Sequence, residues 1–289
     1  MSINGGTSRG RRTALVTGAS RGIGKAAAIA LAKAGLDVAI TARTRHAGEG
    51  RDDSDVGDSR PVPGSLEETA AAVEAEGVRA LPLVADLRDH ASLEAAAAEV
   101  LDRWGRVDVL VNNAITTGPG GMVPFTELTV EQLQTRLDAN VVAQVVMVKA
   151  VLPAMLAAGT GTIVNVTSAV AFSDPPAPVG QGGWGFGYAA SKGAFHRMAG
   201  ILAVELGPEG IVAVNVEPGY VETERQLVNA AANGLEGRYR GAPPSVPGAV
   251  VAWLATDPAA GADRNGQTVR AQKIALELGL HPDWRAPRP

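Results

Sequence analysis

The sequence predicts an α/β fold, a single doubly wound parallel sheet with helices on both faces. Short β-rich apolar runs alternate with longer alanine-rich helical patterns along nearly the whole chain. Several helical patterns end in glycine, as the C-termini of helices often do. The 289 residues, 46% of them hydrophobic, suffice to bury one large core. Strands that alternate with helices of this length form βαβ units, whose connections cover both faces of a parallel sheet.

The expected elements follow one another in a regular order. Apolar, β-rich runs predict strands at residues 13–18, 36–43, 79–87, 107–114, 161–168 and 211–219. Helical patterns lie between them at residues 22–35, 64–77, 92–105, 129–156 and 188–207. We expect the polar, glycine-rich residues 1–12 to be a disordered tail and residues 13–289 to form one domain.

Two segments interrupt this rhythm. Residues 44–64 form a polar insert where a short loop would be expected between a strand and a helix. We expect this insert to be a mobile surface excursion, with a lid over a binding site as the alternative. Residues 171–187 are rich in glycine and proline and carry Trp184 and Phe186, so we expect them to form the wall of a pocket.

The composition argues against several classes of protein. A net charge of −4 and a pI near 5.6 predict no basic surface for nucleic acid or for an anionic membrane. The chain has no cysteine, which excludes disulfides and thiolate zinc sites, and its four histidines form no paired metal motif, so no metal is expected. No secretory signal and no apolar run of membrane-spanning length is expected, which predicts a cytoplasmic protein.

The stretch LVTGASRGIG, residues 15–24, admits two interpretations. Gly-x-Ser-x-Gly is the turn that presents the nucleophile of a serine hydrolase, but that turn needs an oxyanion donor from an earlier loop, and here the strand before it is the first. As a phosphate-binding turn the stretch has no such defect. Gly18 permits the tight turn, Gly22 lets the backbone approach a pyrophosphate, and Gly24 lets the next helix pack closely on the strand. The N-terminus of that helix then faces the anion, which predicts a dinucleotide site.

Further motifs follow in order: ADL at 85–87, NNA at 112–114, Asn140, NVTSAVA around Ser168, YAASK at 188–192 and PGYVET at 218–223. Together with the glycine turn they resemble the short-chain dehydrogenase/reductase family of the Tyr-x-x-x-Lys type. The resemblance implies a Rossmann-like dinucleotide-binding and catalytic domain. It also implies an NAD(P)(H)-dependent oxidoreductase that interconverts a ketone or aldehyde and the corresponding alcohol by hydride transfer. Two features depart from the family: 20 positions separate Ser168 from Tyr188, and the Val-Asp-Gly-Gly that commonly follows Gly266-Gln267 is missing.

The resemblance assigns catalytic roles to Asn140, Ser168, Tyr188 and Lys192. Tyr188 and Lys192 share one face of a helix because they are four residues apart. A nearby ammonium group would lower the pKa of the tyrosine, so that it could exchange a proton with the substrate oxygen as a general acid/base. Ser168 would donate a hydrogen bond to the same oxygen. By resemblance, Asn140 holds a water in the proton path and Lys192 also bonds the nicotinamide ribose.

By the same resemblance, seventeen residues are expected to bind the cofactor: Gly18, Ser20, Arg21, Gly22, Ile23, Gly24, Arg43, Asp86, Leu87, Asn112, Ala114, Tyr188, Lys192, Pro218, Gly219, Val221 and Thr223. The second strand ends in Ala42 and Arg43 instead of the acidic residue that bonds the adenine-ribose hydroxyls in NAD enzymes. Arginine suits a phosphate dianion, so Arg21 and Arg43 predict NADP(H) over NAD(H). An NAD-linked dehydrogenase of an apolar secondary alcohol or a hydroxyacyl compound, with both arginines facing solvent, is the alternative.

Four aromatic residues, Phe172, Trp184, Phe186 and Tyr220, are expected to border the substrate and favour a largely apolar small-molecule carbonyl or alcohol. The family habit and the small residues of the helix at 188–200 suggest a homo-oligomer, a tetramer or a dimer. A non-catalytic dinucleotide sensor on the same fold is the alternative from another class. The intact Tyr188 and Lys192 pair argues against it, since a sensor has no need of a tuned phenol.

Overall fold

The computed structural model describes residues 10–55, 59–232, 234, 237 and 240–285. Its centre is a seven-stranded sheet in the order β3-β2-β1-β4-β5-β6-β7, in which every neighbouring pair is parallel. The strands are β1 (Thr13–Thr17), β2 (Asp37–Ala42), β3 (Ala80–Val84), β4 (Val109–Asn112), β5 (Gly161–Val166), β6 (Ile211–Glu217) and β7 (Thr268–Arg270). The order reverses between β1 and β4, and ligands of such sheets bind outside the carboxyl ends of the strands at this point.

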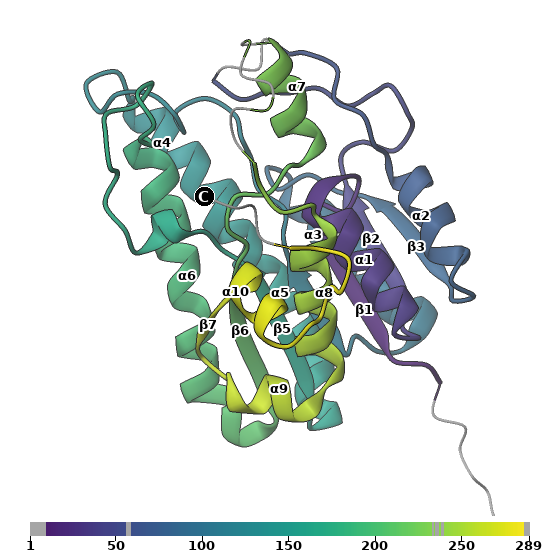
Figure 1. The fold of residues 1–289 in the computed structure, drawn as a ribbon. Coiled ribbons are helices and arrows are strands. Elements are labelled where there is room, and N and C mark those ends of the chain that lie inside the picture. Colours follow the sequence, from purple (N-terminus) through teal and green to yellow (C-terminus); the bar gives the residue numbers. More distant parts are fainter. Residues whose placement is uncertain (1–9, 56–58, 233, 235–236, 238–239, 286–289) are drawn as a thin grey trace, which may run out of the picture.

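Helices cover both faces of this sheet (Figure 1). They are α1 (Gly22–Lys33), α2 (Leu66–Glu74), α3 (His90–Trp104), α4 (Val130–Leu137), α5 (Ala143–Ala158), α6 (Phe186–Leu206), α7 (Glu224–Ala232), α8 (Ser245–Thr256), α9 (Pro258–Asp263) and α10 (Ala271–Glu277). The predicted α/β fold with a doubly wound parallel sheet is confirmed. The elements from α7 to α10 follow the last element that the sequence patterns predict.

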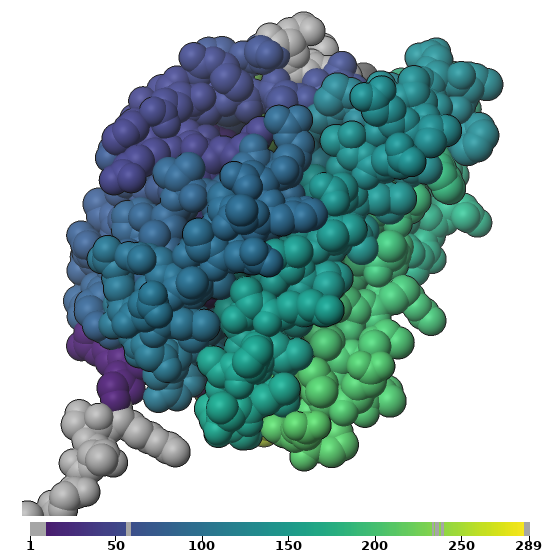
Figure 2. All heavy atoms as spheres, turned by 180° about the vertical axis from the view of Figure 1, so that it is seen from behind, coloured from purple at the N-terminus to yellow at the C-terminus, as the bar shows by residue number. Residues whose placement is uncertain are grey.

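The two layers of core follow from the alternation of side chains along each strand. Ala14 and Val16 of β1 point to the face covered by α1, α2, α8 and α10, whereas Leu15 points to the face covered by α3, α5 and α6. Figure 2 shows the molecule from behind, which is the side of this second face. The bands of blue-green, teal and green correspond to α3, α5 and α6. Because both faces are buried, the strands read as continuous apolar runs in the sequence.

The predicted helix at 129–156 consists of three parts. It begins with a capping box, in which the Thr129 side chain accepts from the backbone N–H of Gln132 and the Gln132 side chain accepts from that of Thr129. One turn of π-helix, Asp138–Val142, then separates α4 from α5. Such π-turns are frequent at functional sites, and this one holds Asn140.

Among the described helices, the continuous stretch Val130–Ala158 is long and apolar enough to cross a membrane, with a mean hydropathy of 2.0 in its most apolar window. Asn140, Gln144 and Lys149 interrupt this stretch, so the expectation that no unbroken apolar run reaches that length is not contradicted. The core helix of a soluble protein passes the same test. Met147, Val151 and Met155 of this stretch are fully buried in the core, as they would be in such a helix.

Two segments that we expect to be irregular make specific contacts in the structure. Residues 1–9 of the expected tail lie outside the described residues, but Arg12 already belongs to the fold, because its guanidinium donates to the carbonyl of Ala255 at 2.8 Å. The described part of the insert, residues 44–55 and 59–64, packs against the body of the protein, and Asp52 within it is fully buried. The insert and α7 lie together above the carboxyl edge of the sheet (Figure 1).

Candidate active site

A cavity of about 650 Å³ opens at the carboxyl ends of the strands, where the strand order reverses. Its walls come from the glycine turn before α1, the end of β2, the loops after β3 and β4, the start of α6 and the segment 218–229. The described part of the insert also reaches it through Ser54. The cavity therefore collects segments that are far apart in the sequence but meet at one edge of the sheet.

The glycine turn has the geometry that the sequence predicts. Gly18 has a positive φ of +66°, and a Cβ there would lie 2.7 Å from the Cα of Ala114. A Cβ on Gly24 would lie 2.4 Å from the carbonyl oxygen of Gly18. The Asn113 side chain fixes the turn from β4, because its Nδ2 donates to the carbonyls of Thr17 at 2.9 Å and Gly18 at 3.1 Å. Any residue other than glycine is therefore excluded at positions 18 and 24, where the turn packs against its own backbone and the loop after β4.

The N-terminus of α1 already binds an anionic group. The backbone N–H of Gly22 donates to Oε2 of Glu224, the first residue of α7, at 2.8 Å. Free N–H groups and the helix dipole make this terminus a site for negative charge, so the carboxylate stands where a phosphate group would be favoured. The donor set and the close-packed glycines therefore fit a dinucleotide pyrophosphate.

Most of the residues predicted to bind cofactor come together around the cavity. Fifteen of the seventeen line it: Gly18, Ser20, Arg21, Gly22, Ile23, Arg43, Asp86, Leu87, Ala114, Tyr188, Lys192, Pro218, Gly219, Val221 and Thr223. Gly24 and Asn112 do not line it. Gly24 packs closely against the backbone of the glycine turn. Asn112 is fully buried, and its Nδ2 donates to Oδ1 of Asn165 at 3.0 Å.

Tyr188 and Ser168 both line the cavity, and their side chains are hydrogen-bonded. Burial raises the pKa of Tyr188, and a hydrogen bond from Ser168 together with the charge of Arg136 only partly offsets this effect. The net pKa is above the ordinary value, which differs from the expectation that Lys192 would lower it. A neutral phenol at pH 7 remains able to donate a proton, whereas a phenolate could only accept one.

Lys192 explains part of this difference. Its Nζ donates to the carbonyl oxygen of Val166 at 2.8 Å, so the ammonium is held by the end of β5. Burial lowers the pKa of Lys192 to about 8. The lysine is thus one turn from Tyr188 on α6 and lines the same cavity, but it acts on β5 in this structure.

Asn140 is buried behind the cavity wall rather than in it. Its Oδ1 accepts from the backbone N–H of Thr116 at 2.8 Å, and its Nδ2 donates to Oγ of Ser191 at 3.3 Å. Ser191 in turn donates to the carbonyl of Tyr188 at 3.0 Å. Asn140 therefore connects the loop after β4 with the turn of α6 that carries the tyrosine.

Arg136 is one of the site residues that the sequence patterns miss. It lines the cavity, and its guanidinium donates to the carbonyls of Thr116 at 3.2 Å and, over a short contact, Gly118. Arg136 is almost fully buried, with a relative exposure of 2%. Its positive charge lowers the pKa of Tyr188. Its place four residues before Asn140, one helical turn away, is the only signal in the sequence that could have indicated it.

The aromatic wall differs from the expectation. Of the four predicted residues only Tyr220 lines the cavity. Phe172 packs against the ring of His196 and Phe186 against Phe125, with ring centroids 5.3 Å and 5.6 Å apart, and both phenylalanines are about half exposed. Trp184 does not line the cavity either, and Ile115 and Met122 from the loop after β4 supply apolar surface there instead.

Comparison with known proteins identifies relatives of this chain. The family model of the short chain dehydrogenases matches residues 12–52 and 59–233. An uncharacterized NAD-dependent oxidoreductase of Mycobacterium tuberculosis is 36% identical over 234 residues, which cover 77% of this chain and 76% of the relative. A 3-oxoacyl-[acyl-carrier-protein] reductase of Synechocystis is 32% identical over 262 residues, which cover 89% of this chain and 94% of that protein.

A solved structure agrees with these relatives. The putative NAD(P)-dependent gluconate 5-dehydrogenase of Beutenbergia cavernae, with NADP bound at low occupancy, superimposes with a TM-score of 0.71 at 31% identity, covering 90% of this chain and 94% of that one. The family match extends over most of the chain, and it includes the glycine turn and the segment that carries Ser168, Tyr188 and Lys192. The chain therefore belongs to the short-chain dehydrogenase/reductase family and is an oxidoreductase that acts on CH–OH and C=O groups.

Proposed function

We propose that this protein interconverts a small ketone or aldehyde and the corresponding alcohol, with Tyr188 as the general acid/base. The observation that supports this most directly is the contact of the Tyr188 phenol with Ser168 inside a cavity that also contains the glycine turn. The glycine turn and the two hydroxyls thus lie in one cavity. The apolar side chains of Ile115, Met122 and Tyr220 favour a largely apolar substrate.

The nicotinamide dinucleotide would supply or accept the hydride, while the protein binds, orients and manages the proton. Gly22 and Ile23 at the start of α1 would hold the pyrophosphate through their backbone N–H groups. During reduction of a carbonyl, Tyr188 would donate its proton to the substrate oxygen as negative charge develops there, and Ser168 would donate a hydrogen bond to the same oxygen. Arg136 favours the deprotonated tyrosine that this step leaves behind, because its positive charge lowers the pKa of the phenol.

Two cofactors remain candidates. The sequence predicts NADP(H) from Arg21 and Arg43, and that preference stays a prediction. One observation favours the NAD-linked alternative: in the structure both guanidinium groups already have partners in the insert, Arg21 with backbone carbonyls and Arg43 with the carboxylate of Asp53. We therefore propose NAD(H) as the preferred cofactor.

A soluble, cytoplasmic homo-oligomer is part of the same proposal. Exposed apolar side chains support an association between copies of this chain: Val142 at the end of the π-helical turn, Val145 on α5, and Ile201 and Val204 on α6. The fold covers its sheet with α5, which supports an interior role for that apolar helix.

The substitution Tyr188→Phe tests the proposed chemistry. We expect kcat on a substrate found in a panel of apolar ketones and secondary alcohols to fall by about 10²- to 10⁴-fold, because the general acid is lost. Steady-state rates give this value, and the dissociation constant of the dinucleotide is measured beside them. It should stay within about threefold of the wild type, since phenylalanine retains the ring and its packing. Unchanged turnover in the variant would contradict the mechanism. Dinucleotide binding without turnover of any member of the panel would favour the sensor.

A further inference from the structure

We infer that Asp53 is a cofactor-selecting residue that favours NAD(H) over NADP(H) by holding Arg43 and repelling a 2′-phosphate. The inference rests on the proposed function. In dinucleotide-binding sheets, the end of the second strand faces the adenine ribose, and an acid or an arginine there decides between a hydroxyl and a phosphate. Here β2 ends with Ala42 and the arginine follows, but the acid comes from the insert, ten residues after Arg43.

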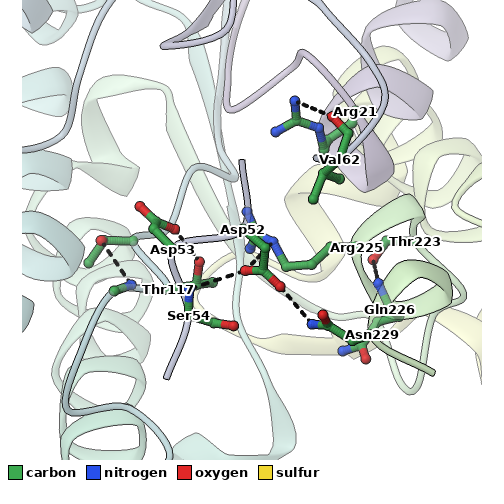
Figure 3. A network of polar contacts seen from close by, with 12 residues as sticks. Arg21, Asp52, Asp53, Ser54, Val62, Thr117, Thr223, Arg225, Gln226 and Asn229 are labelled. Carbon is green, nitrogen blue, oxygen red and sulfur yellow. Dashed lines mark hydrogen bonds and ion pairs between the residues drawn. The ribbon is translucent and has the colours of Figure 1, made fainter. Parts of the chain in front are cut away.

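The carboxylate of Asp53 is fixed from two sides of the cavity. Nη2 of Arg43 donates to Oδ2 of Asp53 at 2.9 Å, and Oγ1 of Thr117 donates to Oδ1 at 2.9 Å. Figure 3 shows Asp53 and Thr117 beside each other in this network. Arg43 and Thr117 both line the cavity, as does Ser54, the neighbour of Asp53. The insert therefore places a carboxylate between the end of β2 and the loop after β4.

Asp53 is ionised at neutral pH. Partial burial raises the pKa of its carboxyl group, but the charge of Arg43 and the hydrogen bonds from Thr117 and Arg43 outweigh this effect, and the net pKa lies below the ordinary value. A carboxylate accepts hydrogen bonds from the hydroxyls of a ribose. It repels a phosphate dianion, and this repulsion is stronger in a partly desolvated cavity than in bulk water.

Arg21 cannot readily take the place of Arg43 as a phosphate partner. Its Nε donates to the carbonyl of Pro63 at 2.8 Å and its Nη2 to that of Gly64 at 3.0 Å, so the guanidinium fastens the end of the insert to the glycine turn. The contact is close, because a Cβ on Gly64 would lie 2.5 Å from the carbonyl oxygen of Ser20. Figure 3 shows Arg21 directed at Val62 of the insert.

Neighbouring carboxylates hold the insert in place and keep Asp53 where it is. Asp52 is fully buried, its Oδ2 accepts from Nδ2 of Asn229 at 2.7 Å, and its Oδ1 lies 3.5 Å from Nε of Arg225 (Figure 3). Asp55 accepts from the backbone N–H groups of Gly120 and Gly121 at 2.8 Å and 2.9 Å. Each of these acids binds a different wall of the cavity, and Asp53 is the one that faces Arg43.

The contribution of the Arg43 and Asp53 ion pair itself is small. Arg43 is about half exposed, and exposed ion pairs add little stability. A 2′-phosphate could therefore draw Arg43 away from Asp53, but the negative charge of Asp53 would remain beside it. The selectivity consequently depends on the charge of the carboxylate, which a single substitution removes.

The test is a fluorescence titration of the purified full-length protein with NADH and with NADPH at one fixed ionic strength. We expect the wild type to bind NADH at least about tenfold more tightly. Asp53→Asn, which keeps the shape but removes the charge, should shift the ratio of the two dissociation constants toward NADPH by at least about tenfold, or about 1.4 kcal/mol. Adding Arg43→Ala to this variant should abolish the gain, because the phosphate then has no cationic partner.

Asp52→Asn is the matched control. It also removes one carboxylate from the insert, but Asp52 bonds to α7 and not to Arg43. We expect it to change both dissociation constants alike and to leave their ratio within about twofold of the wild type. Thr117→Val is a second test that keeps the charge of Asp53 and removes one of its two bonds. It should move the ratio toward NADPH by less than Asp53→Asn does, and the melting temperature of each variant verifies its fold.

The outcomes separate the inference from the function on which it rests. If NADH and NADPH both bind and Asp53→Asn leaves their ratio unchanged, the inference is overturned while the proposed oxidoreductase stands. Tighter binding of NADPH to the wild type also overturns the inference and restores the prediction from the sequence. If the wild type binds neither dinucleotide, the proposed function itself fails.

Discussion

At the scale of single residues, the site combines groups whose surroundings shift their protonation in opposite directions. Tyr188 is favoured in its neutral form because burial raises its pKa, and burial lowers the pKa of Lys192 to about 8. Both shifts disfavour charge in the same cavity. Arg136 remains the cation that acts on the tyrosine. The pKa values of Tyr188 and Lys192 thus depend on burial as much as on their spacing along α6.

Lys192 predicts a dependence of stability on pH. Below pH 8 both the folded and the unfolded protein carry the ammonium charge, and the folded one buries it. Between pH 8 and the ordinary pKa of 10.5, only the unfolded state keeps the proton, so the free energy of unfolding should rise with pH in this window by about 3 kcal/mol. Urea unfolding from pH 7 to 10.5 measures it, with Lys192→Met as the control that lacks the rise. Parallel curves for both proteins would contradict the assigned pKa.

At the scale of elements, α1 and the loop after β4 are joined by glycines that leave no room for a Cβ. The turn holds its shape because Gly18 and Gly24 permit contacts that alanine cannot make. The same helix start then presents free N–H groups, and α7 reaches it with Glu224. Two elements that border the cavity are thereby connected through one hydrogen bond.

Gly24→Ala tests the close packing of α1. A Cβ 2.4 Å from the carbonyl oxygen of Gly18 must displace the backbone, so we expect a loss of about 1–3 kcal/mol of stability and dinucleotide binding weakened at least tenfold. Gly200→Ala in α6 is the matched control, since the nearest atom to its Cβ would be 3.9 Å away. It should stabilise the protein by about 0.5–1 kcal/mol through helix propensity. Thermal and urea unfolding compare the two, and equal effects would count against the packing argument.

Glu224→Gln tests the anion site at the N-terminus of α1. The carboxylate competes with a pyrophosphate for the N–H of Gly22, and its removal should tighten dinucleotide binding about two- to fivefold, as expected for a charge worth 0.3–1 kcal/mol at a helix terminus. Titration with the same dinucleotide measures the change. Glu222→Gln is the control, because Glu222 bonds to the backbone N–H of Gly241 and not to α1. Weaker binding by Glu224→Gln would show that the carboxylate supports the site instead.

At the scale of the whole molecule, the described part of α6 has two sides. Its inner side carries Tyr188 and Lys192 at the cavity and Phe195 and Ala199 in the core. Its outer side exposes Ile201 and Val204 to solvent, the latter with 81% of its surface. Exposed apolar side chains on the helix that carries Tyr188 and Lys192 support the proposed association between copies of the chain.

Val204→Glu tests this association. We expect the wild type to have the mass of a dimer or a tetramer in size-exclusion chromatography with light scattering, and the variant to have a smaller mass because the glutamate cannot be buried unpaired. Val130→Glu, an exposed position on α4, is the control and should leave the mass unchanged. A monomeric wild type would contradict the expected oligomer.

The sequence by itself determined the order of strands and helices from β1 to β6, the glycine turn and many of the residues around the cavity. These features are local: apolar periodicity, helix caps and glycines at fixed spacing are visible within about 20 residues. The order of the motifs resembles that of a known family, and this resemblance added Ser168, Tyr188 and Lys192 to the predicted site.

Only the tertiary structure decided what depends on contacts between distant segments. Asp52 bonds to Asn229, 177 residues away, and this contact places the insert against α7 although its composition predicts a mobile loop. The bond from Lys192 to Val166 and the approach of Arg136 to Tyr188 depend in the same way on how β5, α4 and α6 pack. Contacts between distant segments, and not local propensity, determine the protonation states and partners of the charged groups around the cavity. Burial and the distance to a partner are properties of the folded chain alone.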